Sequence, residues 1–178
     1  MRVISGKYKG KKIEGFNIDG TRPTMDRVKE SVFGSIQNYV KDSVCLDLFA
    51  GSGSLGIEAL SNGATCCHFV DNGSVAYKTL EQNLKWIEEE TYTYKMDYQK
   101  ALQTFYDKNI KFDIIFIDPP YALNLISDAL KTIQEYNLLK EDGIIICEYE
   151  QEKIVTDFSC IKEKKYGSTY ISIYKHNK

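Results

Sequence analysis

From residue 43 onward, short apolar runs alternate with longer amphipathic stretches. Five of the runs have the length and composition of strands, and the stretches between them carry apolar residues at helical spacing. Because a helix between two strands favours a parallel crossover, this order predicts an α/β fold with a doubly wound, mostly parallel sheet. The predicted strands are 44–49, 67–70, 91–96, 112–117 and 143–149.

The two ends of the chain depart from this alternation. Residues 2–16 combine spaced apolar residues with lysines and turn-forming glycines, which predicts a small β-hairpin. Apolar residues at helical spacing between 25 and 40 predict a helix after it. Residues 161–167 and 169–175 predict two antiparallel strands that meet near Gly167 at the edge of the sheet.

The domain organisation follows from length and continuity. No repeat, low-complexity tract or linker interrupts the 178 residues, a length that suits one domain with a substantial core. We therefore expect a single domain over residues 1–178, in which an N-terminal hairpin and helix (1–42) extend a core (43–178).

Composition bears on the compartment and on metal binding. Hydrophobic residues make up 43% of the chain, but no apolar run approaches the roughly 20 residues needed to cross a bilayer. The N-terminus also lacks the apolar centre of a signal peptide. The five cysteines show no CxxC spacing, so neither a zinc site nor a disulfide framework is indicated. We expect a cytoplasmic protein with no membrane partner and no metal.

Charge is unevenly distributed along the chain. The net charge of −2 argues against a generic nucleic-acid binder, yet residues 1–30 carry eight Lys and Arg against four Asp and Glu. Their balance of +4 leaves −6 for the other 148 residues. Such a basic segment is typical of a surface that contacts a polyanion, and equally of a solvated β-ribbon with lysines along its edge. A nucleic-acid surface here would include Arg2, Lys7, Lys9, Lys11, Lys12 and Arg22.

A glycine-rich loop follows the first core strand, in the stretch DLFAGSGSLG. Gly51, Gly53 and Gly56 match GxGxxG, where glycines let the backbone turn tightly and approach a bound nucleotide. Asp71 ends the next strand twenty residues after Gly51, the position from which a carboxylate reaches ribose hydroxyls. A tight turn followed by a polar strand end is the simpler alternative, but it explains fewer of these features together.

The loop does not by itself identify the cofactor, because NAD and S-adenosylmethionine both present an adenosine ribose to the acid of the second strand. Asp47, inside the first strand, favours S-adenosylmethionine, since its carboxylate could approach the amino group of a methionine moiety or organise the loop. Asp97, after the third strand, could accept a hydrogen bond from an adenine amino group. Capping of the next helix is an alternative role for Asp97.

The stretch FDIIFIDPPYA ends an apolar strand with an acid, two prolines and an aromatic residue. Proline fixes φ at about −65°, so the Pro119 carbonyl is aimed in advance. Asp118 and this carbonyl could accept both hydrogens of an exocyclic amine on a nucleobase, which directs the nitrogen lone pair at a sulfonium methyl. Tyr121 offers a face on which the base can stack. A rigid turn alone would explain Pro119 and Pro120 but not the whole set.

These motifs resemble those of the amino-methyltransferases that use S-adenosylmethionine. DLFAGSG and DPPY are shared by several such families. The chain is similar to one of them over nearly its whole length, in MRVISGKYKGKKI, TRPTMDRVKESVFGSI, LDLFAGSGSLGIEALSNGA and YGSTYISIY. That family is the RsmD-like methyltransferases, which modify the N2 amine of a guanine in small-subunit (16S) ribosomal RNA.

The resemblance implies a Rossmann-like methyltransferase fold, S-adenosylmethionine as cofactor, and ribosomal RNA, within a small-subunit particle, as partner. It implies cofactor-binding residues along the glycine loop and at the next two strand ends, namely Asp47, Phe49, Gly51, Ser52, Gly53, Asp71 and Asp97. The chain departs from the family pattern beside Asp97, where Met96 and Tyr98 replace the glycine and alanine common in relatives.

The resemblance also implies the groups around the base and the RNA. The residues that would hold the guanine are Asp118, Pro119, Pro120 and Tyr121. The TRPT.DR positions Arg22, Thr24 and Arg27 would border the site and contact RNA or the cofactor. Arg2, Lys7 and Lys9 of the basic segment are expected to contact RNA because of their charge.

Three other functions use parts of the same sequence. Methylation of adenine N6 or cytosine N4 in DNA needs the same acceptor geometry, but the chain has no insertion the size of a target-recognition domain. An NAD-dependent oxidoreductase would use the glycine loop, but His68 lies inside a strand and His176 in the tail, so neither suits hydride chemistry. A non-catalytic RNA chaperone with this fold would not depend on Asp118.

Overall fold

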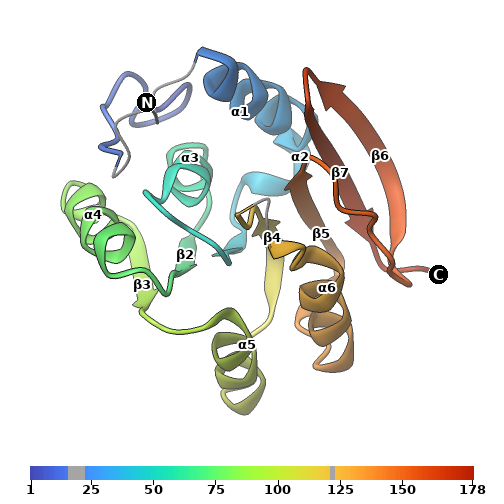
Figure 1. Cartoon of the computed structure of the whole chain (residues 1–178). Helices are drawn as coiled ribbons and strands as arrows, with labels where there is room; N and C mark the ends of the chain where they lie inside the picture. The colour runs from blue at the N-terminus through green and yellow to red at the C-terminus, as the bar shows by residue number, and fades with distance from the viewer. Residues whose placement is uncertain (16–22, 121–122) are drawn as a thin grey trace.

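The structure is a computed structural model that describes residues 1–15, 23–120 and 123–178, with the backbone alone for 23–25. Within these residues, seven strands form one sheet in the order β3-β2-β1-β4-β5-β7-β6 (Figure 1). The same residues contain no helix long and apolar enough to cross a membrane. The strands are β1 (Val44–Asp47), β2 (Cys66–Val70), β3 (Glu90–Tyr94), β4 (Phe112–Ile117), β5 (Leu139–Tyr149), β6 (Ser159–Tyr166) and β7 (Thr169–Lys175). The helices are α1 (Pro23–Ser35), α2 (Gln37–Val40), α3 (Ser54–Ser61), α4 (Ser74–Leu84), α5 (Tyr98–Asp107) and α6 (Ile126–Glu135).

Strands β1 to β5 pair in parallel, which confirms the predicted α/β sheet. The chain runs outward from β1 to β3 and then returns to place β4 on the other side of β1. Asp47, the last residue of β1, lies level with Phe69 of β2 and Phe116 of β4, each one residue before the end of its strand. The five strands therefore bring their carboxyl ends to one edge of the sheet, where ligands bind in open α/β folds.

Two hydrophobic clusters, one on each face of the sheet, hold the layers together. On one face, α1 to α4 pack on strand residues such as Phe69 and Phe116 (Figure 1). On the other face, α5 and α6 pack on strand residues such as Ile115 and Ile145. Because both faces are covered, the central strands are apolar at nearly every position, as the sequence of β4 predicts.

The predicted antiparallel pair at the C-terminus is confirmed. β7 pairs with β5 in antiparallel orientation, and β6 pairs with β7 at the edge of the sheet. Gly167 makes the turn between them with a positive φ of 61°, a conformation that glycine adopts without strain. The hairpin lies beside α1, so it can contribute to the same edge of the molecule as the parallel strands (Figure 1).

The N-terminal segment is not the regular hairpin that its sequence predicts. In its described part, one isolated antiparallel bridge joins Arg2 to Lys12, and no strand forms. Around this bridge, Val3 N–H donates to the Lys11 carbonyl and Ile13 N–H to the Met1 carbonyl. The next two N–H groups, those of Ile4 and Ser5, donate instead to the Glu58 carboxylate of α3. The segment is therefore an arch held by α3.

The helix predicted between residues 25 and 40 is divided into two. α1 ends at Ser35 and α2 begins at Gln37, with Ile36 between them at a φ of −114°, outside the helical range. Ile36 is almost completely buried. The break lets this side chain remain in the core while the chain changes direction toward β1.

Candidate functional site

A cavity of about 1030 Å³ lies at the carboxyl edge of the sheet, at the switch point between β1 and β4. Small-molecule sites usually measure roughly 300–1,000 Å³, so this cavity can hold a nucleotide-sized ligand and a further group beside it. Lys29 of α1 and residues 166–169 of the β6–β7 turn line it from the opposite side. Acidic residues at or just after the ends of the parallel strands also line it, namely Asp47, Asp71, Asp97, Asp118 and Glu148.

The glycine loop connects β1 to α3 along one wall of the cavity. Gly51 and Ser52 line the cavity, and Gly51 has a positive φ of 55°. Gly53, also predicted to bind the cofactor, is buried behind the loop as the residue that precedes α3. Its φ is 89°, and a Cβ there would lie 2.6 Å from Cδ1 of Leu80. Gly53 therefore shapes the turn and packs the loop on α4.

Asp47 organises the loop from below. Its side chain is 1% exposed, and its Oδ2 accepts a hydrogen bond of 3.1 Å from the backbone N–H of Gly56 in the first turn of α3. Burial raises the pKa of this carboxyl to about 7, the Gly56 N–H opposes the rise, and the Asp71 carboxylate adds to it. Of the two roles predicted for Asp47, the structure shows the loop-organising one.

Asp71 joins the end of β2 to the glycine loop. Its Oδ2 accepts from Gly51 N at 2.8 Å, and its Oδ1 accepts from Gly73 N at 2.8 Å. A carboxylate oxygen has a second lone pair, so each can still accept from a hydroxyl in the cavity. The position fits the ribose-binding role predicted for Asp71.

Asp97 caps helix α5. Its Oδ2 accepts from Gln99 N at 3.0 Å, which is the alternative role that the sequence allowed. Asp97 also lines the cavity, so capping does not remove it from the site. The rings of Phe49 and Tyr98 lie 5.2 Å apart beside it and line the same wall. Phe49 therefore lines the cavity, and its contact with the cofactor stays a prediction.

Asp118 lies directly after β4 and faces the cavity with Pro119 and Pro120. Pro119 is buried and Pro120 is exposed. The surrounding protein withdraws water from the Asp118 carboxyl, and Glu148 and Asp47 lie near it, so its pKa is well above its usual range. Tyr121, predicted to stack on the base, lies outside the described residues.

Glu148 is a site residue that sequence reasoning missed. It lies near the end of β5, lines the cavity and helps to raise the pKa of Asp118. The signal for it was an acid near the end of an otherwise apolar strand, the same pattern that identified Asp47 and Asp118.

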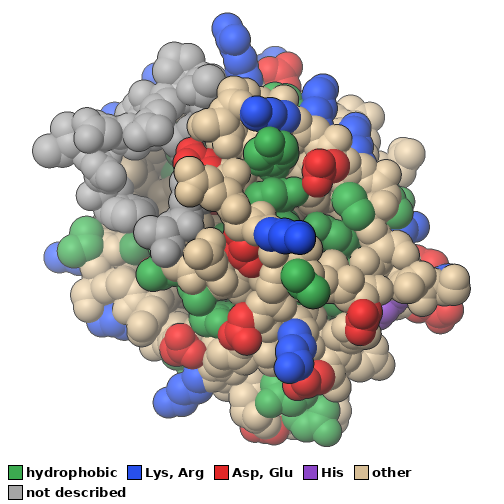
Figure 2. Space-filling view, turned by 45° about the vertical axis from the view of Figure 1, so that its right-hand side comes forward, with side chains coloured by type: hydrophobic (Ala, Val, Ile, Leu, Met, Phe, Trp, Pro, Cys, Tyr) green, Lys and Arg blue, Asp and Glu red, His purple; other side chains and the backbone are tan. Residues whose placement is uncertain are grey.

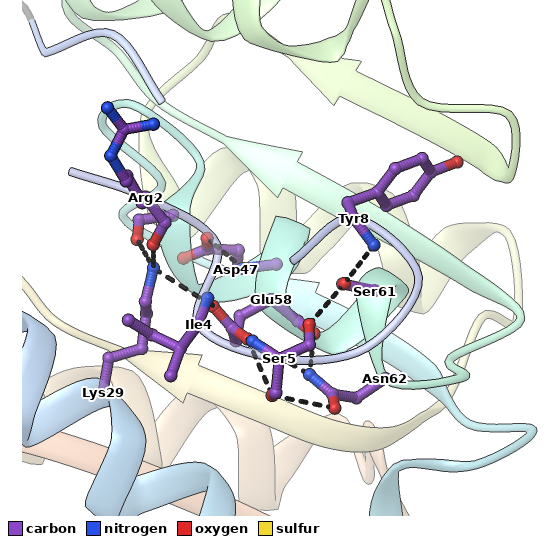
Figure 3. Close-up of polar contacts among 11 residues, drawn as sticks. Arg2, Ile4, Ser5, Tyr8, Lys29, Asp47, Glu58, Ser61 and Asn62 are labelled. Atoms are coloured by element: carbon purple, nitrogen blue, oxygen red, sulfur yellow. Dashed lines mark hydrogen bonds and ion pairs between the residues drawn. The ribbon is translucent and has the colours of Figure 1, made fainter. Parts of the chain in front are cut away.

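Lys29 and Glu58 form a second group that the sequence analysis did not single out. Lys29 Nζ lies 3.2 Å from Glu58 Oε1 and donates to the Arg2 carbonyl and to Ser54 Oγ, at 2.8 and 3.0 Å. Figure 3 shows Glu58 between Lys29 on one side and the N-terminal arch on the other. This buried pair fixes α1 and the arch against α3, and so fixes one wall of the cavity.

The predicted RNA-contacting residues are only partly described. Lys7 forms ion pairs of 3.0 Å with Glu88 and Glu89, and the Arg2 guanidinium donates to the Gly10 carbonyl. Lys9 and Arg27 are exposed, whereas Arg22 and the side chain of Thr24 lie outside the described residues. On the face seen in Figure 2, basic and acidic side chains are interspersed. In the basic segment itself, Lys7 and Lys12 are paired with acids and the Arg2 guanidinium is bound to a carbonyl, so its described part is not a continuous surface of free cations.

The comparisons with known proteins agree with this geometry. The model of the family described as "Conserved hypothetical protein 95" matches residues 1–175. YlbH of Bacillus subtilis, provisionally named an rRNA methyltransferase, is 42% identical over 98% of each chain. Ribosomal RNA small subunit methyltransferase D of Haemophilus influenzae is 35% identical over 99% of this chain and 94% of its own.

A solved structure extends the likeness to three dimensions. The Escherichia coli protein yhhF, provisionally described as a methyltransferase, superposes with a TM-score of 0.87 and 28% identity, over 99% of this chain and 98% of its own. Solved structures described as a methyltransferase and a methylase superpose on nearly the whole chain, which confirms the Rossmann-like methyltransferase fold. The chain therefore belongs to the family of the RsmD-type methyltransferases, as its motifs predict.

Proposed function

We propose that the chain transfers a methyl group from S-adenosylmethionine to the exocyclic N2 amine of a guanine in small-subunit ribosomal RNA. The observation that carries the proposal is the position of Asp118 and Pro119. They follow β4 and line the same cavity as the glycine loop and Asp71. The oxygens that could accept hydrogen bonds from the amine and the loop that could bind the nucleotide therefore border the same cavity.

The residues around the loop fit S-adenosylmethionine. The oxygens of Asp71 would accept from the ribose hydroxyls and those of Asp97 from the adenine amine, while Gly51 and Ser52 would carry the methionine end. When bound, the cofactor supplies a methyl group on a positively charged sulfur, which needs no further activation. Asp47 contributes by holding the first turn of α3, 3.1 Å from its carboxylate, so that the loop keeps its shape.

Asp118 and Pro119 would act on the amine. The guanine N2 nitrogen is a poor nucleophile because its lone pair is delocalised into the ring. If the Asp118 carboxyl and the Pro119 carbonyl each accept one N2 hydrogen, the nitrogen becomes pyramidal and its lone pair turns toward the methyl group. Such fixed acceptors cost no reorganisation at the moment of reaction. Tyr121 would stack on the base.

The proposed substrate class rests on the family. Its curated relatives include proteins named as small-subunit ribosomal RNA methyltransferases. A small-subunit particle in the cytoplasm is the proposed partner, because a structured ribonucleoprotein needs only a modest cationic surface to dock. The exposed Lys9 and Arg27 would take part in this contact.

Methylation of an adenine or cytosine amine in DNA is the nearest alternative. The experiment that separates the two uses labelled S-adenosylmethionine with small-subunit particles from a strain lacking the protein, and with duplex DNA. The products are digested to nucleosides and identified by mass. We expect N2-methylguanosine from the particles, and a loss of at least ~100-fold in the Asp118→Ala variant.

Asp113→Ala is the matched control, because Asp113 lies at the opposite end of β4 and bonds the backbone N–H of Val44. It should retain the activity. Methyladenine or methylcytosine in DNA would overturn the substrate and keep the acceptor chemistry. Failure to bind S-adenosylmethionine would overturn the whole proposal.

A further inference from the structure

Asp118 and Glu148 lie side by side at the carboxyl edge of the sheet. The parallel register between β4 and β5 pairs Ile117 with Cys147, and the next residue on each strand is one of these acids. Neighbouring strands are about 4.8 Å apart, so two side chains level with each other and directed to the same cavity meet. Both acids line that cavity, and Glu148 is one of the groups that raise the pKa of Asp118.

The charges around this pair are mainly negative. Asp47 approaches from β1, and Glu150 lines the cavity just beyond β5. The described cation on the facing helix α1 that lines the cavity is Lys29, and its ammonium is engaged by Glu58, 3.2 Å away. Two carboxyl groups in such surroundings do not both ionise readily, because their like charges repel at short distance.

A hydrogen bond between two carboxyl groups requires a proton on one of them. We propose that Glu148 is a positioning residue for Asp118: it shares one proton with the Asp118 carboxyl and so sets the pH above which Asp118 can serve the amine. This role rests on the proposed function. Burial and the neighbouring Glu148 raise the pKa of Asp118, in the direction that the shared proton requires.

The pair also receives the proton that the reaction releases. As the nitrogen–carbon bond forms, the carbon–sulfur bond breaks and its electron pair stays on sulfur. The nitrogen then carries one proton in excess. Once the pair has lost its shared proton, Asp118 accepts the proton from nitrogen, and Glu148 holds it on the pair until it passes to water. The amine ends neutral, and the pair returns to its starting state.

The test is the pH dependence of methyl transfer to small-subunit particles, in the wild type, Glu148→Gln and Glu141→Gln. Glu141 lies on the same strand, exposed and far along it from Glu148. The amide introduced by Glu148→Gln cannot hold a negative charge, and it donates to an ionised Asp118. We therefore expect the rising acid limb of Glu148→Gln to lie at least about one pH unit below that of the wild type. Glu141→Gln should superpose on the wild type.

A rate that falls in Glu148→Gln by the same factor at every pH, with the acid limb unmoved, would overturn the proposal and leave Glu148 a structural residue. Wild-type protein that methylates no particle RNA at any pH would instead overturn the proposed function. The two failures are therefore distinguishable.

A second readout needs neither cofactor nor RNA. A carboxyl whose pKa is raised in the folded state loses stabilisation as the pH rises from the unfolded value, about 4, through the folded value. Unfolding of the free protein in urea at several pH values should show a steeper decline in stability for the wild type than for Glu148→Gln. Parallel declines in these two proteins would contradict a shared proton.

Discussion

The carboxylate of Asp71, which follows β2, accepts a hydrogen bond of 2.8 Å from the backbone N–H of Gly51, twenty residues earlier in the loop after β1. The same carboxylate accepts from Gly73 N at 2.8 Å. One side chain thus sets the conformation of two loops that border the cavity. Loss of Asp71 should therefore disturb binding through the loops as well as through the ribose contact.

Asp71→Ala should weaken S-adenosylmethionine binding by roughly 10–100-fold, because two loop N–H groups and the ribose hydroxyls lose their acceptor. Isothermal titration calorimetry measures this affinity directly. Asp113→Ala is the control, since Asp113 also accepts from a backbone N–H, that of Val44, but at the other end of the strands. If both substitutions weakened S-adenosylmethionine binding equally, the loss of affinity would reflect a general loss of stability and not the position of Asp71.

Gly56→Ala should destabilise the fold by about 1–3 kcal/mol. A Cβ at Gly56 would lie 2.3 Å from Cε1 of Phe69 and 2.7 Å from Sγ of Cys67, so α3 must move away from β2. Gly34→Ala is the control, because no atom lies within 4 Å of a Cβ on this helical residue. That change should be neutral or stabilising by up to ~1 kcal/mol. Urea unfolding measures the stability of both variants. A Gly56→Ala protein as stable as the wild type would contradict the close packing of α3 on β2.

Glu58→Ala should cost about 3–5 kcal/mol of stability, because Lys29 would remain buried without its partner. Burial lowers the pKa of Lys29, and the Glu58 carboxylate opposes that fall. The double variant Glu58→Gln with Lys29→Met should recover much of the loss. Glu141→Ala, which breaks an exposed pair with Lys178, should cost no more than ~1 kcal/mol. Comparable losses for the two pairs in urea unfolding would contradict the role of burial.

His68 should make the protein less stable in mild acid. Burial lowers its pKa to about 4 from 6.5, and its ring is stacked on Tyr92 and hydrogen-bonded to the Tyr94 hydroxyl. Since the unfolded chain takes up the proton more readily, stability is full above pH 6.5 and declines as the pH falls toward 4, by roughly 3 kcal/mol.

The comparison for His68 is His68→Phe, which keeps an aromatic ring and has no titrating group. The difference in unfolding free energy between the wild type and this variant should change with pH mainly between 6.5 and 4. A difference that is constant over this range would show that His68 titrates alike in the folded and unfolded states.

The sequence was informative where one local pattern determines the structure. Continuous apolar runs predicted the buried strands, and the acids that follow them, Asp71 and Asp118, meet because parallel strands share one carboxyl edge. For Glu148, the acid near the end of an apolar strand was a local signal that sequence reasoning passed over, whereas its partnership with Asp118 depends on the register of two strands separated by a helix. That register is a tertiary property, which the local pattern around either residue does not contain.

The N-terminal segment shows the same limit. Alternating apolar residues and glycines predict a hairpin, and antiparallel pairing does form around Arg2 and Lys12. It stops there, because Glu58, 54 residues away from Ile4, binds the N–H groups of Ile4 and Ser5 and draws the chain onto α3. The predicted cationic surface is less positive than its sequence suggests for a similar reason. Lys7 is paired with Glu88 and Glu89, more than 80 residues later in the chain. Long-range partners decided both outcomes.

The arch is translated well before the side chains that hold it. Glu58 follows Ile4 by 54 residues, and Glu89 follows Tyr8 by 81. At bacterial or eukaryotic elongation rates, the interval between synthesis of the arch and synthesis of its partners is therefore on the order of ten seconds. The β6–β7 turn, which lines the cavity, is translated after the glycine loop and Asp118. A nascent chain that stops before this hairpin would carry the glycine loop and Asp118 but would leave the cavity open on one side.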